Sequence, residues 1–359
     1  MKRVVALLLA VVAMAAVAAD SSEAILVLLN SQTSGSPRVY RQALEQIREE
    51  AAQGKVLQEF VYGAICPEDP ASAKYLEHAR PKIRQMAEKR NNALAWYLLS
   101  IETQDIDALR KAVDGGNIQA YNAWGTVMHN HILGNPEMSS ERREEVAKAI
   151  FEVFGKAAAA KDANGLYNLG MCYMTGLGVD KNPELAFDAF RSAAELGHPE
   201  AINNLGGCYR DGVAVEQDLA QAAKWFEKSA SFGNPYGQIN YALALQNGEG
   251  VAQDEAKAAK YFEEVIQEHQ MPEAYNLLAV CYMTGRGVAK DEKRGTALFL
   301  ESAKRGFIPA MDNLSSCYDE GTGVEANALK ATEWKLRAKA AAGDINAARW
   351  LEQNGYKPL

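Results

Sequence analysis

Four kinds of short functional motif are missing from this sequence of 359 residues. It contains no Ser-x-x-Lys, no His-Glu-x-x-His, no Walker loop and no Gly-x-Gly-x-x-Gly, which serve acyl transfer, zinc-dependent hydrolysis, phosphate binding and dinucleotide binding. Histidine is scarce, and the one close pair, His129 and His131, has no Cys, Asp or third His near it in the sequence. We therefore expect a solvated loop at that pair, no metal site, no cofactor and no enzymatic activity.

Basic runs and long β-branched stretches are also absent. The formal net charge is −8 at pH 7. Nucleic acids and anionic membranes attract basic surfaces, so an acidic chain of this kind argues against both as partners. The scarcity of β-branched runs excludes a β-rich fold.

An apolar run at the start of the chain has the layout of a secretory signal peptide. Lys2 and Arg3 precede the apolar residues 4–17, and the small residues Val-Ala-Ala at 17–19 precede an aspartate. The run is too short to span a membrane, and the first cysteine, Cys66, lies too far away for a lipid anchor. We expect export to the periplasm or the outside with cleavage after Ala19; a buried N-terminal helix is the alternative.

Between Gly165 and Asn346 one phrase occurs five times, and each copy ends on a valine. The valines are spaced 36, 36, 37 and 36 residues apart. A fixed period of this size is typical of a solenoid, in which each unit buries its apolar face only against its neighbours. Function is therefore expected on an extended surface and not in a pocket. The phrases are LGMCYMTGLGV ending at Val179, LGGCYRDGVAV at Val215, YALALQNGEGV at Val251, LAVCYMTGRGV at Val288 and LSSCYDEGTGV at Val324.

Each copy has the stop and start signals of two helices. A glycine three residues before the valine suits a helix C-cap with positive φ. An Asn or Asp three residues after the valine suits the N-cap of a second helix. Each period is therefore predicted to be one α-hairpin. The glycines are Gly176, Gly212, Gly248, Gly285 and Gly321, and the caps are Asn182, Asp218, Asp254, Asp291 and Asn327.

The combined pattern, A-x-x-x-L-G-x-x-Y-x-x-G-x-G-V followed by D-x-x-x-A-x-x-W/Y-F-x-x-A-A-x-x-G, resembles the Sel-one-like repeat (SLR) family, a relative of the tetratricopeptide repeats. The resemblance is specific across residues 165–346. It implies an all-α fold, namely a right-handed α-solenoid of antiparallel helix hairpins. It also implies protein–protein interaction, because family members take part in envelope signalling, polysaccharide secretion and host contact.

The expected organisation has four parts. Residues 1–19 are the signal peptide, 20–119 a divergent N-terminal helical region, 120–346 the Sel-one-like repeats with well-matched copies at 165–346, and 347–359 a C-terminal capping segment. About eight hairpins are expected altogether. The third copy departs from the pattern at Ala244 and Leu245 and carries a one-residue insertion near Pro272, so a change in the curvature of the solenoid is expected there.

Five cysteines in an exported protein raise the question of disulfides. Four of them occupy the same position of the first helix in different copies: Cys172, Cys208, Cys281 and Cys317. Neighbouring helices pack about 8–10 Å apart, whereas a disulfide needs Cα atoms within about 4.4–6.8 Å. We therefore expect buried free thiols at these positions.

The resemblance implies that a stripe on the first helices faces a groove. The stripe is rich in Met and apolar residues in the first, third and fourth copies and acidic in the fifth, which suits an apolar peptide with a basic flank. Asparagines beside it can bond to a peptide backbone. Two alternatives stay open: the stripe packs on the adjacent repeat, and the asparagines bond to a neighbouring repeat. The candidate residues are Tyr167, Asn168, Met171, Met174, Asn203, Asn204, Arg210, Ile239, Asn240, Leu243, Asn276, Val280, Met283, Asp312 and Asn313.

The sequence thus predicts an exported, non-enzymatic scaffold that binds a protein or peptide. The alternative is a cell-envelope hydrolase of β-lactam or peptidoglycan type, as suggested for cysteine-rich relatives. The missing nucleophile motif weighs against that alternative.

Overall fold

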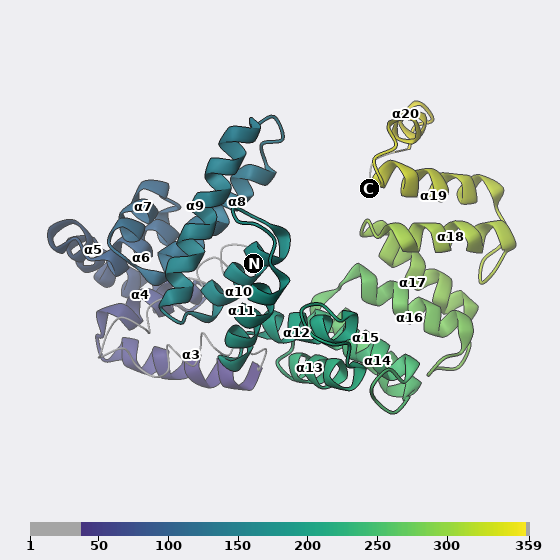
Figure 1. Cartoon of the computed structure of the whole chain (residues 1–359), viewed down its shortest axis with the longest axis horizontal. Coiled ribbons are helices and arrows are strands. Elements are labelled where there is room, and N and C mark those ends of the chain that lie inside the picture. Colours follow the sequence, from purple (N-terminus) through teal and green to yellow (C-terminus); the bar gives the residue numbers. More distant parts are fainter. Residues whose placement is uncertain (1–36, 357–359) are drawn as a thin grey trace. The chain divides into compact units, whose positions relative to one another are not determined.

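The computed structural model describes residues 37–356, so the predicted signal peptide lies outside the described residues. Within them the fold is all-α, with eighteen helices and no strand. Within each of its two compact units, consecutive helices pack against one another, and helix hairpins follow one another as in an α-solenoid (Figure 1). The predicted fold class is confirmed.

The helices belong to two compact units. The first unit comprises the described residues up to Gln217 together with the short segment Phe232–Asn234. The second unit comprises Asp218–Ser231 and the described residues from Pro235 onward. The first unit contains α3 (Pro37–Ala52), α4 (Val56–Ile65), α5 (Ser72–Arg90), α6 (Ala93–Thr103), α7 (Ile106–Asp114), α8 (Ile118–Leu133), α9 (Ser140–Ala159), α10 (Ala163–Thr175), α11 (Pro183–Glu195) and α12 (Pro199–Asp211). The second contains α13 (Leu219–Ser231), α14 (Pro235–Asn247), α15 (Glu255–His269), α16 (Pro272–Thr284), α17 (Glu292–Lys304), α18 (Ile308–Glu320), α19 (Ala328–Ala341) and α20 (Ile345–Gln353).

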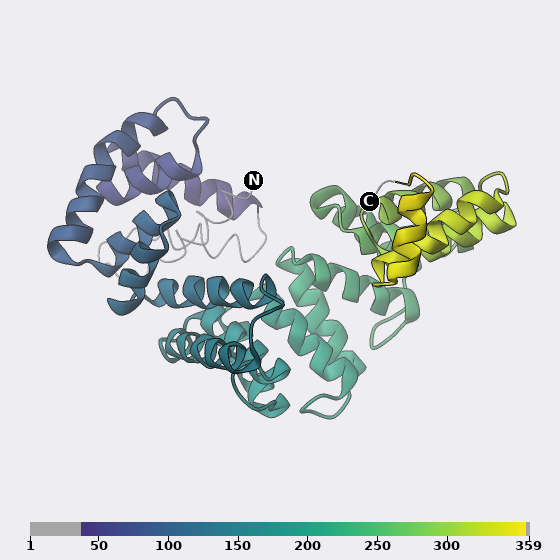
Figure 2. The same cartoon turned by 90° about the horizontal axis from the view of Figure 1, so that it is seen from above.

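Hairpin pairing follows the chain. In the first unit α4 packs on α5, α6 on α7, α8 on α9 and α10 on α11, and α10 also packs on α9; Figure 2 shows the same helices from above. In the second unit the pairs are α14 with α15, α16 with α17 and α18 with α19, and α20 packs on α19. The sequence places α12 and α13 in one repeat, and they fall into different units.

The predicted helix caps are confirmed in all five copies. The side-chain oxygen of each cap accepts a hydrogen bond from the backbone N–H three residues later, at 2.9–3.0 Å. The five glycines that end the first helices have φ between 67° and 79°. This left-handed conformation favours glycine because a Cβ would meet the following carbonyl oxygen.

A second glycine in four of the five loops lies directly on the preceding hairpin. A Cβ on Gly250 would overlap the carbonyl oxygen of Leu219, and one on Gly287 would overlap that of Glu255. Leu219 and Glu255 are the first residues of α13 and α15. The loops therefore contact the preceding second helix through backbone atoms. Only the second copy departs, with Ala214 at φ 61°.

Small and large side chains alternate in the hairpin core. Four second helices bury a phenylalanine eight residues after the cap: Phe190, Phe226, Phe262 and Phe299. An alanine four residues after the cap lets the two helices of a hairpin approach, and Gly295 takes this place in α17. The repeated residues therefore position the first helices, where the candidate site lies.

The hairpins before residue 160 differ in their loops and helix lengths. α5 has 19 residues and α9 has 20, against 13 to 15 in the second helices of the five copies. The expected solvated loop at His129 and His131 is wrong, because both residues lie in α8. No Gly-x-Gly-Val loop interrupts this helix, so it continues to Leu133.

Candidate interaction surface

The first helices of the second unit each expose one column of four positions, spaced i, i+4, i+7 and i+11, which is one face of an α-helix. In α14 the outer position Tyr236 is 53% exposed, and the inner Leu243 is half-buried. In α16 the first three positions are half-buried and only Thr284 is exposed, whereas in α18 only Asn313 is half-buried. We call the twelve residues the first-helix face: Tyr236, Asn240, Leu243, Asn247, Glu273, Leu277, Val280, Thr284, Pro309, Asn313, Ser316 and Glu320.

Hydrogen bonds between repeats hold these three helices side by side. Asn313 Nδ2 donates to Asn276 Oδ1 at 2.9 Å, joining α18 to α16. Gln246 Nε2 donates to Cys281 Sγ at 3.2 Å, joining α14 to α16. Arg286, after α16, donates to the Gln246 carbonyl oxygen at 2.6 Å. The first-helix face is therefore continuous over α14, α16 and α18.

Asparagines also bond between repeats in the first unit. Asn168 Nδ2 donates to Asn122 Oδ1 at 3.4 Å, and Asn204 Nδ2 donates to Met171 Sδ at 3.6 Å. Both acceptors belong to the preceding first helix. Asn168, Asn204 and Asn313 thus use their amides between repeats, which is the structural alternative raised by the sequence.

The predicted stripe residues lie at different depths. Ile239 and Asn276 are buried, Asp312 is exposed, and the other twelve are half-buried. Met283 faces its own hairpin, because a Cβ on Gly295 would come within 2.5 Å of its Sδ. Their role in a groove stays a prediction.

Sequence reasoning missed the last position of the column. It lies four residues before the loop valine and is exposed in every copy. Continuing the helix period by one turn beyond Met171 or Leu243 would have found it. The five residues are Thr175, Asp211, Asn247, Thr284 and Glu320.

His198 occupies the N-cap of α12 and is 5% exposed. Its Nδ1 accepts a hydrogen bond from the Ala201 N–H at 3.3 Å, and its Nε2 lies 3.2 Å from Asn164 Oδ1. The ring stacks on Tyr167 with 4.5 Å between centroids. Burial lowers the pKa of His198 to about 4. The neutral ring therefore caps the helix, with Nδ1 as acceptor.

All five cysteines are buried free thiols. Burial raises the pKa of Cys172 to about 12 and that of Cys208 to about 11. A thiol attacks as the thiolate, so these groups are unreactive at neutral pH.

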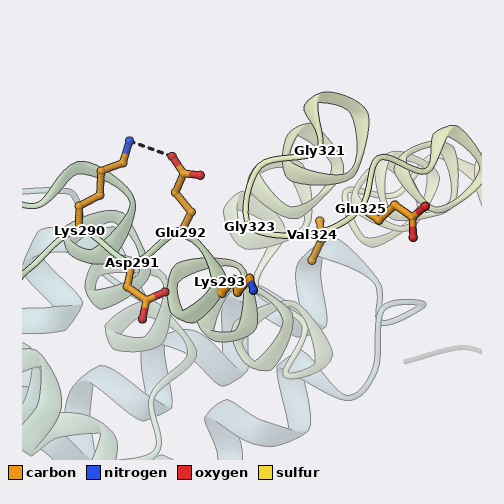
Figure 3. A pocket seen from close by; sticks show the side chains of 8 residues that line it. All are labelled: Lys290, Asp291, Glu292, Lys293, Gly321, Gly323, Val324 and Glu325. Atoms are coloured by element: carbon orange, nitrogen blue, oxygen red, sulfur yellow. Dashed lines mark ion pairs between the residues drawn. The ribbon is translucent and has the colours of Figure 1, made fainter.

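An open pocket lies between the loops on either side of α17 and α18 (Figure 3). The pocket is lined by charged side chains of both signs and by the glycine loop that follows α18. Among the lining residues, Lys290 Nζ forms an ion pair with Glu292 at 2.8 Å. Within residues 37–356 no three His, Cys, Asp or Glu side chains gather as a metal site. None of the helices described there is long and apolar enough to cross a membrane.

The Sel1 repeat family model matches five stretches of the chain: residues 163–198, 199–234, 235–264, 272–307 and 308–341. Each stretch begins at or next to the first residue of a first helix, from α10 to α18. The predicted family is therefore confirmed, and the matched stretches begin where the first helices begin. A comparison with curated proteins gives no match.

Two solved structures share this architecture. A Sel1 repeat protein from Oxalobacter formigenes is 26% identical with a TM-score of 0.56, over 72% of this chain and 95% of that one. The protein c5321, a protective antigen of uropathogenic Escherichia coli strains with an SLR fold, is 26% identical with a TM-score of 0.59, over 87% of this chain and 67% of that one. The second likeness extends beyond the five matched stretches.

Proposed function

We propose, from the premise that residues 163–341 of this chain are five Sel1 repeats, that the protein is a non-enzymatic scaffold that binds another protein or a peptide. Sel1 repeats generally mediate protein interactions. The observation that carries the proposal is the continuous first-helix face, which presents half-buried apolar side chains and exposed polar ones on three neighbouring helices. Such a face suits a partner segment more than a small substrate.

We further propose that the partner is met in the cell envelope or outside the cell. The support is the charged, apolar and small-residue order of residues 1–19. Cell fractionation with intact-mass analysis tests this part. We expect a mature chain that begins at Asp20, and a cytoplasmic chain that retains Met1 would refute export.

A photocrosslinking amino acid at Leu243 tests the interaction itself. Leu243 lies on α14 within the first-helix face, whereas Lys260 lies on α15 with its side chain 74% exposed. We expect a discrete crosslinked protein from Leu243 in intact cells and none from Lys260. Equal products from both positions, or none from Leu243, would contradict the proposed surface.

The hydrolase alternative is tested by turnover of nitrocefin and of muropeptides by the purified chain. We expect no turnover above the buffer rate. A rate that is abolished by a single side-chain substitution would replace the scaffold proposal.

A further inference from the structure

We propose that the first-helix face of the second unit binds a protein segment in which apolar residues adjoin Lys or Arg side chains. This inference rests on the proposed interaction function and specifies its partner. It follows from how charge and apolar surface are divided between the first and second helices of this unit.

The first helices of the second unit carry charge of one sign. α14, α16 and α18 contain no Lys or Arg, and α18 contains three carboxylates, Asp312, Asp319 and Glu320. The second helices α15, α17 and α19 contain both signs. Solubility alone does not require this division, because mixed charge on every exposed face would serve it equally.

Ion pairing increases the difference in charge between the first and the second helices. Three carboxylates of the second helices pair with arginines: Glu255 with Arg286 at 2.7 Å, Glu301 with Arg305 at 2.7 Å and Glu333 with Arg337 at 3.0 Å.

In contrast, all three α18 carboxylates are exposed, and across residues 37–356 none of them forms an ion pair. Glu320 belongs to the first-helix face, and Asp312 and Asp319 lie beside it, one turn before and one turn after Ser316. Glu320 accepts only a hydrogen bond from the Thr322 hydroxyl, at 3.4 Å. Unpaired negative charge on one helix attracts a cationic group over about 8–10 Å in physiological salt.

The apolar part of the face lies on the other two helices. Leu243 on α14 and Leu277 and Val280 on α16 are half-buried, so each presents part of its side chain to a partner. Neighbouring first helices lie about 8–10 Å apart, and an extended chain spans about 3.3 Å per residue. A segment of about six residues therefore reaches from the apolar helices to the carboxylates of α18. Apolar and basic side chains a few residues apart complement this face.

Selection from a phage-displayed library of random peptides tests the inference with the full chain. In low-salt buffer we expect enrichment of sequences that place Leu, Ile, Val or Phe beside Lys or Arg. The substitutions D312N, D319N and E320Q together keep side-chain size and remove the charge. They should weaken binding of a selected peptide roughly tenfold, because each exposed charge pair contributes modestly.

A charge-matched variant is the control. E264Q, E268Q and E325Q remove the same formal charge from α15 and from the loop before α19, and should leave the affinity unchanged. Circular dichroism confirms that both variants are folded. Enrichment of acidic or uncharged peptides, no enrichment at all, or equal loss in both variants would overturn the inference. If Leu243 still crosslinks its protein in the D312N/D319N/E320Q variant with unchanged yield, the interaction function stands and the basic partner segment is refuted.

Discussion

The hairpins before residue 160 and the five repeats after it reach the same helix-pair architecture with different buried chemistry. Among the described residues, the buried carboxylates Glu50 and Glu59 belong to α3 and α4. Glu50 accepts a hydrogen bond from Gln58 at 3.0 Å, and Glu59 lies 2.6 Å from His78 Nδ1. The repeats bury amides, hydroxyls and one histidine instead. A buried carboxylate must be paired to be tolerated.

Helix ends show the same contrast. α5 and α6 end at Asn91 and Gln104, which adopt positive φ without being glycine. The repeats end their first helices at glycine and add a second glycine that contacts the preceding hairpin through backbone atoms. Close backbone contact thus sets the register of the repeats, whereas side-chain pairs hold the early hairpins. This difference explains why the repeats are recognisable from sequence and the early hairpins are not.

The largest expected effect comes from Gly287→Ala. The new Cβ would overlap the carbonyl oxygen of Glu255 at φ 75°, so the loop and α15 must separate. We expect a loss of about 3 kcal/mol or more in the free energy of unfolding, since backbone strain and lost packing add. Urea unfolding followed by circular dichroism measures this loss.

Gly306→Ala is the matched control for that loop. Gly306 has φ 86°, and a Cβ there would meet no atom within 4 Å. Only the left-handed strain remains, so the loss should be about 1 kcal/mol. Equal losses at the two glycines would show that the backbone contact between repeats does not stabilise the solenoid.

The next largest effect is expected from His198, which should make the free energy of unfolding depend on pH. Its pKa is about 4 in the folded chain against an ordinary value of 6.5, and burial is the cause. Between these values the unfolded chain binds more protons, so the stabilising contribution is present above pH 6.5 and is lost as pH falls toward 4. The full contribution is on the order of 3 kcal/mol.

His198→Asn isolates this dependence, because Asn234 occupies the equivalent place in the next copy and asparagine is a good N-cap. Burial raises the pKa of Asp162 and Glu200, which act in the opposite direction as the pH falls. The difference in unfolding free energy between the wild type and the variant is therefore measured at pH 7 and pH 5. A difference that stays constant between these pH values would refute the neutral cap.

A smaller effect is expected for Glu59→Gln in the first unit. Glu59 is 5% exposed, and its contact with His78 would lose the charge of the carboxylate. Hydrogen bonds to charged groups contribute about 1.5–3 kcal/mol, so a loss of about 2 kcal/mol is expected. Glu49→Gln, on an exposed position of α3, should cost less than about 0.5 kcal/mol. Comparable losses would mean that the early hairpins do not depend on this pair.

Local turn chemistry made most of the repeat fold predictable. Each cap and each glycine acts within a few residues of its own helix, so the sequence pattern contained the whole interaction. The N-terminal hairpins have no such periodic signal. His129 and His131 look like loop residues in isolation, and only the packing of α8 on α9 shows otherwise.

The surface was predictable only in part. Helix periodicity placed Leu243 and Val280 on the stripe, where both are half-buried, and their role in a groove stays a prediction. It did not show that Met283 turns toward α17, because that depends on the missing Cβ of Gly295 in a partner helix. Periodicity also gave no account of ion pairing, which joins side chains of different repeats, as in Arg286 with Glu255.

Ala214→Gly gives the smallest effect and the opposite sign. Ala214 has φ 61° at the position where the other four copies have glycine. Relief of the left-handed strain gains about 1–2 kcal/mol, and the greater freedom of glycine in the unfolded chain costs about 0.4–1 kcal/mol. The net gain should be about 0.5–1 kcal/mol in urea unfolding. Ala340→Gly within α19 has no strain to relieve and should lose about 1 kcal/mol. A loss at Ala214 as well would show that its methyl group is packed in a way that makes the second copy different from the others, and that glycine is not required for register at every loop.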